Sequence, residues 1–227
     1  MKKLLLFLFN HRTLALLRWD LYFLRIRLVN FMLQTRRRAR VFAASRPKPV
    51  YLNLGSGPRG LDDTHWVNVD GFRDKNVQFL LDFNRGLPFA NDIFDGVFCE
   101  HVLEHFSLED GEKLMREVCR CLRVGGAARI VVPDAEKILK TYFEDPAKLI
   151  DYKLEGRGTA MQAVNACFRQ RYEHQFLYDW ASMQAMLLRA GFSKVTHVVY
   201  SQSELCQHIV LDDPKYEWES LYVEVLK

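Results

Sequence analysis

The chain has 227 residues, of which 49% are apolar and 26% charged, and its net charge is +4. This length and apolar content allow a buried core, which excludes an intrinsically disordered protein. The positive charge is concentrated at one end: residues 1–40 hold ten Lys or Arg and one acid, whereas the remainder holds 22 basic and 27 acidic residues. This acidic remainder argues against a nucleic-acid partner for the main domain.

The chain contains an odd number of cysteines without the paired spacing of a disulfide framework or a zinc ribbon. They are Cys99, Cys119, Cys121, Cys167 and Cys206. Reduced thiols in a cytoplasmic protein are the simplest interpretation of this pattern.

The N-terminal segment combines apolar residues with regularly spaced charges. The apolar run 4–9 follows two lysines, but it is short and no small-residue cleavage site follows it, which disfavours a signal peptide. Arginines and Asp20 interrupt every window long enough to span a bilayer. His11, Arg18 and Arg25 recur every seven residues, a spacing that predicts a basic amphipathic helix of the kind that lies on membrane surfaces.

A helix that packs on the main domain or on a second subunit, in a homodimer, is the alternative interpretation of residues 1–40. In either case Arg46-Pro47-Lys48-Pro49 forms a stiff linker. The sequence therefore predicts two parts, an N-terminal helix with its linker over residues 1–45 and a folded domain over residues 46–227.

A glycine turn follows the first apolar run of this domain. Residues 50–54 lead into Gly55-Ser56-Gly57, and a second apolar run ends on Asp70. Glycines let backbone amides approach a ligand closely, and a carboxylate at the end of the second strand can accept two ribose hydroxyls. The pattern predicts a nucleoside pocket.

Beyond the turn, strand and helix patterns alternate, which predicts an α/β fold with a mostly parallel, doubly wound sheet. The expected strands are 50–54, 66–70, 77–82, 94–100, 127–133, 195–200 and 221–226, and the expected helices are 107–123, 134–143 and 179–189. Residues 145–175 are less regular and are interpreted as an insertion near the substrate.

Residues 55–60 also match G-x-G-x-x-G, the fingerprint of nicotinamide dinucleotide binding. Pro58 would begin the pyrophosphate-binding helix without an amide, and only a short irregular stretch precedes the second strand. A nicotinamide-dependent oxidoreductase is therefore the weaker alternative.

A longer ordered series of motifs gives a more specific signal. It comprises Asp82-Phe83-Asn84-Arg85-Gly86-Leu87-Pro88-Phe89, Asp92-Ile93-Phe94-Asp95-Gly96-Val97, Glu100-His101-Val102-Leu103-Glu104-His105 and Leu122-Arg123-Val124-Gly125-Gly126. With the glycine turn, this series resembles the class I S-adenosylmethionine-dependent methyltransferases, in particular the type 11-like, sugar- and polysaccharide-associated branch. The resemblance covers roughly residues 50–200.

The resemblance implies a Rossmann-like sheet of seven strands whose last strand is antiparallel, and S-adenosylmethionine as the cofactor. The implied cofactor-binding residues are Asn53, Gly55, Ser56, Gly57, Asp70, Asp82, Phe83 and Glu100. Asp70 would hold the ribose hydroxyls, and Asp82 with Phe83 would contact the adenine. The family usually has an acid where this chain has Asn53, whose amide would hydrogen-bond the methionine ammonium without a charge.

Methyl transfer to a hydroxyl needs a group that removes the proton of the acceptor. The predicted catalytic residues are His174, His101 and Glu100. Glu100 and His101 directly follow the fourth strand, and His174 resembles a recurrent histidine of sugar-polymer-associated methyltransferases. A histidine with no catalytic role remains the alternative for His174.

Residues 101–105 also match H-x-x-E-H, a pattern of zinc hydrolases. That pattern requires a helix and a further ligand downstream, whereas here it straddles a strand-to-helix turn. We therefore predict no metal. In the resembled family Leu103-Glu104-His105 often has a structural role, with the histidine buried against the sheet.

These observations predict a cytoplasmic methyltransferase that O-methylates a saccharide, a glycan or a small molecule at the inner membrane face. One alternative is a non-catalytic, methyltransferase-like partner protein tethered by its N-terminal helix. Another is a membrane-binding module without catalysis.

Overall fold

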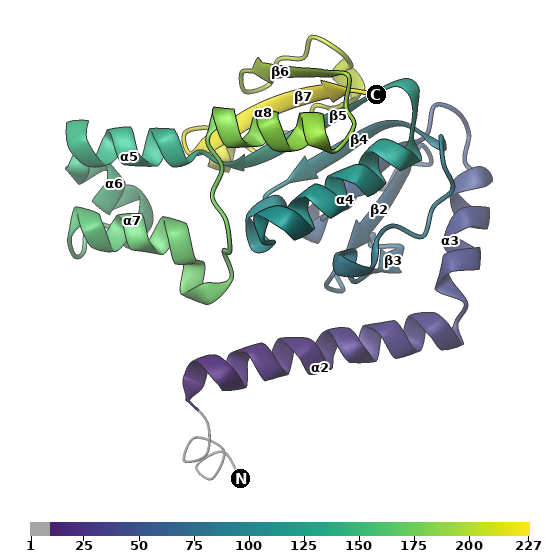
Figure 1. Cartoon of the computed structure of the whole chain (residues 1–227), viewed down its shortest axis with the longest axis horizontal. Helices are drawn as coiled ribbons and strands as arrows, with labels where there is room; N and C mark the ends of the chain where they lie inside the picture. The colour runs from purple at the N-terminus through teal and green to yellow at the C-terminus, as the bar shows by residue number, and fades with distance from the viewer. Residues whose placement is uncertain (1–9) are drawn as a thin grey trace.

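The computed structural model describes residues 10–227, in which seven strands form one sheet (Figure 1). Their order is β3-β2-β1-β4-β5-β7-β6, with β7 antiparallel to both of its neighbours. The strands are β1 (Tyr51–Leu54), β2 (Trp66–Asp70), β3 (Phe79–Leu80), β4 (Phe94–Glu100), β5 (Leu122–Pro133), β6 (Lys194–Val198) and β7 (Ser220–Leu226). The predicted α/β fold, with a mostly parallel seven-stranded sheet and an antiparallel last strand, is confirmed.

The helices are α2 (His11–Met32), α3 (Thr35–Ala44), α4 (Leu108–Cys121), α5 (Ala135–Glu144), α6 (Pro146–Leu154), α7 (Ala160–Arg169) and α8 (Trp180–Arg189). Figure 1 shows α4 and α8 across one face of the sheet, α2 and α3 along one side, and α5 to α7 grouped beyond the strand ends. The other face is covered by the loop between β6 and β7, whose Ile209 packs with Tyr51 and Phe98. Because both faces are covered, β1 and β2 are buried along their whole length.

Residues 145–175 are largely helical, so the prediction that they are irregular is wrong, whereas their position near the substrate stays a prediction. Residues 145–175 contain α6, α7 and a short 3₁₀ turn at Gln170–Tyr172. Thr159 caps α7 reciprocally with Gln162, and Leu149, Ala163 and Cys167 form a small core with Ile138 of α5. This core lies apart from the sheet, and its short helices stabilise one another by contacts that local patterns do not reveal.

Two strands differ most from their predicted ranges, whereas β1, β6 and β7 differ by one or two residues at their ends. The first, β5, begins at Leu122 rather than at residue 127 and includes Gly125 and Gly126. The glycine pair indicated a helix end followed by a loop, yet Leu122 pairs with Phe94 of β4 before a shift of register. The edge strand β3 keeps only two of its six predicted residues.

The N-terminal segment forms two helices rather than one, because Gln34 adopts a left-handed conformation with φ +49° between α2 and α3. Residues 1–9 of the predicted helix lie outside the described residues. One face of α2 contacts the domain: Tyr22 Oη donates to the carbonyl of Gly71 (3.0 Å), and Asn30 Nδ2 donates to that of Leu80 (2.9 Å). None of the helices between residues 10 and 227 is long and apolar enough to cross a bilayer.

Candidate active site

The glycine turn lies between β1 and β2 in a conformation that requires its glycines. Gly55 and Gly57 have φ of +75° and +47°. A Cβ on Gly55 would lie 2.1 Å from Val102 Cγ2, whereas a Cβ on Gly57 would meet nothing within 4 Å. Ser56 is buried and its hydroxyl has no hydrogen-bond partner among the described residues. The turn therefore leaves open space at Gly57, next to a buried hydroxyl that lacks a partner.

Asp70 ends β2 beside this turn. Its Oδ2 accepts from the amide of Gly57 (2.7 Å), and its Oδ1 accepts from the amide of Phe72 (2.7 Å). Each carboxylate oxygen can accept a second hydrogen bond. The two backbone bonds thus fix the carboxylate and leave it able to accept a pair of ribose hydroxyls.

Asp82 and Phe83 follow β3 and are both buried. Asp82 Oδ1 accepts from the amide of Asn84 (3.2 Å), and Oδ2 lies 2.8 Å from Nε of Arg27 on α2. The N-terminal helix therefore reaches the predicted adenine position, a contact that the sequence analysis did not anticipate.

Asn53 is buried in β1 and its amide nitrogen donates to Asn68 Oδ1 (3.2 Å) and to the carbonyl of Arg59 (3.5 Å). These bonds link the first two strands to the segment after the glycine turn. The contact of its amide oxygen with the methionine ammonium stays a prediction.

Glu100, at the end of β4, is held by two parts of the chain. It forms an ion pair with Arg59, and its Oε1 accepts from the amide of Asp213 (3.0 Å). Burial raises the pKa of Glu100, although the hydrogen bond from the Asp213 amide and the charge of Arg59 act to lower it. Arg59 also bonds the carbonyl of Leu211, so it joins the glycine turn, β4 and the C-terminal loop. The sequence analysis missed Arg59, although it lies within the G-x-G-x-x-G match.

His101 has a constrained position directly after β4. Its φ is +52°, a conformation that non-glycine residues seldom adopt outside functional or tightly packed sites. Its Nδ1 lies 3.1 Å from Oε1 of Glu104, its Nε2 lies 3.1 Å from Ser220 Oγ, and its ring packs on Tyr216. Burial alone would raise the pKa of Glu104, but the hydrogen bond and charge of His101 outweigh it, and the pKa is lowered. A carboxylate therefore orients this imidazole.

His174 and His101 line the same cavity, which has a volume of about 470 Å³. Burial lowers the pKa of His174, opposed by the charge of Glu104. His105, which we expected to be buried against the sheet, is instead half-buried at this cavity, and Glu104 is the buried member of the motif. The structure thus brings His101 and His174 to one cavity, whereas Glu100 is tied to Arg59.

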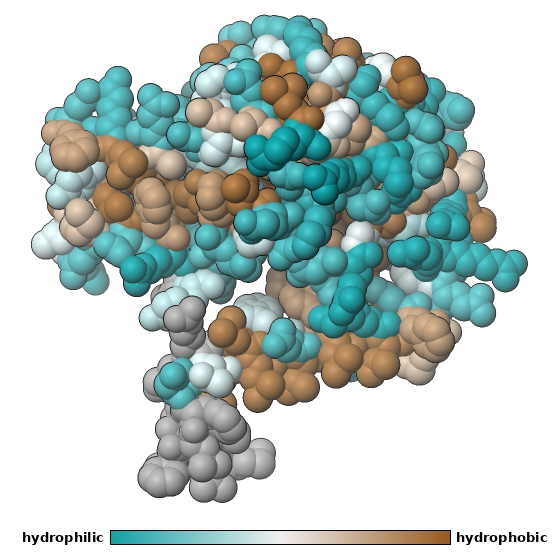
Figure 2. All heavy atoms as spheres, viewed as in Figure 1, coloured by the Kyte–Doolittle hydropathy of each residue, from teal (hydrophilic) through white to brown (hydrophobic). Residues whose placement is uncertain are grey.

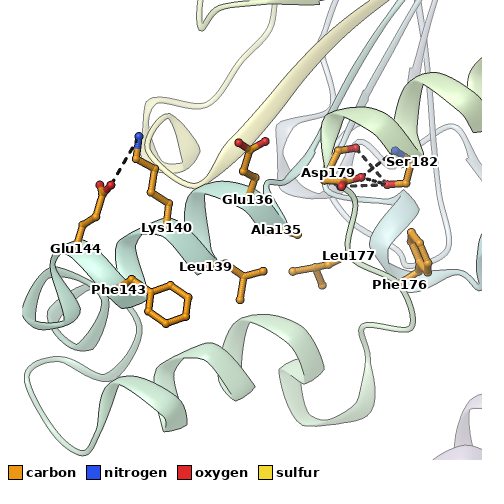
Figure 3. A pocket seen from close by; sticks show the side chains of 10 residues that line it. All are labelled: Ala135, Glu136, Leu139, Lys140, Phe143, Glu144, Phe176, Leu177, Asp179 and Ser182. Carbon is orange, nitrogen blue, oxygen red and sulfur yellow. Dashed lines mark hydrogen bonds and ion pairs between the residues drawn. The ribbon is translucent and has the colours of Figure 1, made fainter.

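A second cavity of about 660 Å³ lies between α5 and the segment leading into α8. Figure 3 shows Leu139, Phe143 and Leu177 at its apolar part, with Asp179 and Ser182 hydrogen-bonded to each other at one end. It contains no predicted site residue, so its larger volume does not make it the reaction site.

The comparisons with known proteins concern the fold and part of the chain. Residues 65–130 match the family model described as a methyltransferase domain. No curated protein matches the chain. Solved structures with a similar fold include a complex of the Trm112 methyltransferase activator from Haloferax volcanii with a protein named as a methyltransferase. That structure has 14% identity and a TM-score of 0.50, over 92% of this chain and 96% of that one.

Phosphoethanolamine N-methyltransferase 2 of Haemonchus contortus, in complex with S-adenosyl-L-methionine, has 13% identity and a TM-score of 0.50, over 80% of this chain. A protein named as an O-methyltransferase from Nostoc punctiforme has 16% identity and a TM-score of 0.43, over 85% of this chain. The chain spans 49% and 57% of the lengths of these two structures.

The residues at the glycine turn fit the cofactor of these enzymes. The turn provides open space at Gly57 and an unpartnered hydroxyl at Ser56, and the fixed carboxylate of Asp70 lies beside them. The chain thus has the Rossmann-like fold of these methyltransferase structures, its residues 65–130 match a methyltransferase domain, and S-adenosylmethionine is the cofactor that its glycine turn fits.

Proposed function

We propose that the chain O-methylates a saccharide, a glycan or another small hydroxyl compound, with His101 as the general base. The observation that carries this proposal is the pair formed by His101 and the buried carboxylate of Glu104, at the carboxyl end of β4. Ligands of open parallel sheets bind beyond the carboxyl ends of the strands, where this pair faces the 470 Å³ cavity.

The cofactor-binding roles follow the sequence prediction. We assign the ribose hydroxyls to Asp70, the methionine end to the turn Gly55-Ser56-Gly57 with Asn53 and Glu100, and the adenine to Asp82 and Phe83. When bound, the cofactor supplies a methyl group already activated on a sulfonium sulfur. The residues of the chain then have to orient the acceptor and accept its proton.

His101 is suited to that proton transfer. Its Nδ1–H donates to Glu104, which leaves Nε2 as the basic nitrogen and stabilises the imidazolium that forms. The same cavity is lined by three further polar residues and one aromatic residue, namely Lys153, Gln170, Lys215 and Tyr216. Hydrogen-bonding groups beside an aromatic ring suit a sugar, whose hydroxyls need partners and whose ring faces are apolar.

Replacing Asp70 with alanine should weaken S-adenosylhomocysteine binding on the order of 100-fold, because two hydrogen bonds to a charged group are lost. Titration calorimetry measures the affinity, with NAD in parallel. Transfer of a labelled methyl group to a panel of monosaccharides, oligosaccharides and simple alcohols then tests the acceptor class.

The exposed arginine Arg116 provides a matched control, and its alanine variant should bind as the wild type does. Binding of NAD instead would support the oxidoreductase. A wild type that binds neither ligand would point to the non-catalytic partner protein, and transfer only to nitrogen acceptors would contradict the O-methylation.

We further propose that the outer face of α2 lies on an anionic membrane surface, at the cytoplasmic side. Five large apolar side chains of this helix are between 45% and 85% exposed: Leu17, Leu21, Leu24, Leu28 and Phe31. Figure 2 shows the resulting apolar band along this helix. Exposed arginines supply charge complementary to anionic lipids. They are Arg18 and Arg25 of α2 and the three consecutive arginines in the first turn of α3.

Replacing both Leu21 and Leu28 with glutamate should weaken binding to phosphatidylglycerol-containing vesicles by about 100-fold or more, because these two leucines no longer enter the lipid. Vesicle co-sedimentation at low and high salt measures this binding, which salt should weaken. Val124, 84% exposed on β5, is the control position for a glutamate. If the wild type does not bind vesicles but forms a dimer, and the double substitution dissociates that dimer, the outer face of α2 contacts a second copy of the chain instead.

A further inference from the structure

Three potential metal ligands converge at one end of the 470 Å³ cavity. They are Glu104 and His105, in the 3₁₀ turn after β4, and His174, which precedes α8. One ligand atom from each lies within 4.8 Å of the other two. The two imidazole rings meet nearly edge to face, with their centroids 5.1 Å apart.

Backbone carbonyls select the tautomer of both histidines. His105 Nδ1 lies 3.2 Å from the carbonyl of Glu173, and His174 Nδ1 lies 2.7 Å from that of Cys167. Because a carbonyl can only accept, each Nδ1 carries the hydrogen, and each Nε2 of the neutral ring presents a lone pair. A carbonyl partner on Nδ1 is the arrangement that commonly orients metal-ligating histidines.

Glu104 supplies an oxygen that lacks a partner. The residue is only 1% exposed, and Oε1 receives the hydrogen bond from His101. Oε2 is buried with no hydrogen-bond partner among the described residues. An ionised oxygen in that position is unfavourable unless a positive group satisfies it. A cation bound by His105 and His174 would be such a group.

The chain holds these ligands in place without a metal. The carbonyl of Glu104 accepts from the amide of Gln175 (2.7 Å), and the carbonyl of His105 accepts from Gln175 Nε2 (2.7 Å). Gln175 therefore joins the segment after β4 to the segment that carries His174. The nearby ammonium of Lys153 is paired with Glu219, which reduces its repulsion of a cation.

We propose that Glu104, His105 and His174 bind one divalent transition-metal ion whose open coordination positions face the cavity. Two imidazoles and one carboxylate suit Zn²⁺, Mn²⁺, Fe²⁺ or Co²⁺ better than Mg²⁺ or Ca²⁺, which prefer oxygen ligands alone. The acceptor hydroxyl coordinates the open positions, which positions it and makes it more acidic. This last role rests on the proposed O-methylation, whereas the metal site rests on the contacts described above. His174 is then a ligand rather than the proton acceptor.

We predicted no metal because H-x-x-E-H straddles a strand-to-helix turn, whereas the zinc-hydrolase pattern requires a helix and a further ligand downstream. The structure supplies that ligand, His174, some 70 residues later in the chain, through an arrangement different from the zinc-hydrolase pattern. His101 does not belong to the cluster; its Nδ1 contacts Oε1 of Glu104, which leaves Oε2 to the cluster.

Titration of chelator-treated full-length protein with Co²⁺, followed by its visible absorption, tests the site without cofactor or acceptor. We expect one equivalent to bind, with an affinity at least about 100-fold weaker in both His105→Ala and His174→Ala, since loss of a ligand exceeds loss of an outer-shell partner. His197→Ala changes an exposed histidine on β6 and should bind as the wild type does. Circular dichroism verifies that the variants fold.

Absence of saturable Co²⁺ binding, or equal binding by His174→Ala, would overturn the site. A thiolate charge-transfer band would assign the ion to cysteine and overturn it as well. Addition of a chelator should slow methyl transfer without weakening S-adenosylhomocysteine binding. If methyl transfer continues unchanged after the chelator is added, the ion does not coordinate the acceptor, although metal binding and O-methylation still stand. If the protein binds the metal but transfers no methyl group, the proposed O-methylation is wrong and the metal site still stands.

Discussion

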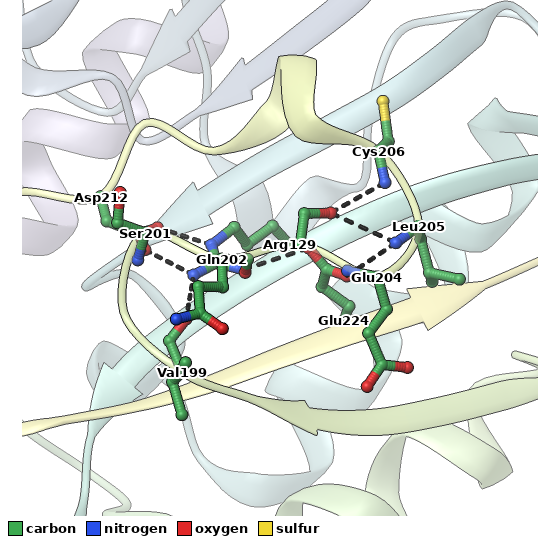
Figure 4. Close-up of polar contacts among 10 residues, drawn as sticks. Arg129, Val199, Ser201, Gln202, Glu204, Leu205, Cys206, Asp212 and Glu224 are labelled. Carbon is green, nitrogen blue, oxygen red and sulfur yellow. Dashed lines mark hydrogen bonds and ion pairs between the residues drawn. The ribbon is translucent and has the colours of Figure 1, made fainter.

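Replacing Arg129 with methionine should lower the free energy of unfolding by about 3–5 kcal/mol, because two buried carboxylates lose the cation with which they form ion pairs. Arg129 of β5 has no exposed surface. Its guanidinium forms ion pairs with Asp212 and Glu224, which are themselves buried, and donates to the carbonyls of Val199 and Gln202. Figure 4 shows these contacts converging from the loop between β6 and β7.

This arginine also holds a loop that contacts residues of the candidate active site. The loop that it holds carries Leu211 and Asp213, which bond Arg59 and Glu100, and Tyr216, which packs on His101. Loss of Arg129 should therefore loosen the C-terminal loop and reduce methyl transfer even where the sheet stays folded.

Urea unfolding followed by tryptophan fluorescence measures the stability, and limited proteolysis tests the loop. Arg116→Ala removes an exposed arginine that pairs with Glu112 and should change stability by less than about 1 kcal/mol. Equal losses from the two substitutions would show that the buried network contributes no more than a surface ion pair.

Replacing His101 with asparagine should lower kcat on the order of 10²- to 10⁴-fold, the usual contribution of a general base. Asparagine is the appropriate replacement because it tolerates the left-handed backbone that His101 adopts, so the fold and the end of β4 are preserved. Its amide cannot accept the acceptor proton. The affinity for S-adenosylhomocysteine should stay within a few-fold of the wild type.

Steady-state transfer of a labelled methyl group gives kcat and KM separately, and calorimetry gives the cofactor affinity. The control is His65→Asn, which changes a histidine whose ring nitrogen Nδ1 lies 2.8 Å from the carbonyl of Pro49, away from the cavity. A kcat that is unchanged in His101→Asn would remove His101 from the mechanism. A loss confined to KM would indicate acceptor binding instead of proton transfer.

Local sequence patterns predicted most of the sheet. The predictions of the central strands rest on apolar runs that end at turn residues. Residues 66–70 are an example, and the structure contains this strand without change as β2. The predicted helices 107–123 and 179–189 begin at Ser107 and Asp179, which cap α4 and α8 in the structure. A capping side chain acts within one turn and is therefore a local signal. These signals are local, and the fold leaves them unaltered.

The order of motifs along the chain by itself predicted the class of fold, which the structure confirms, and a nucleoside pocket, because the glycine turn and Asp70 belong to consecutive strands that lie side by side. Only the tertiary structure decided how more distant residues combine. Arg27 reaches Asp82, the C-terminal loop reaches Glu100, and His174 reaches Glu104. Such contacts join segments tens of residues apart, and local periodicity carries no information about them, since they depend on how helices and loops pack against the finished sheet.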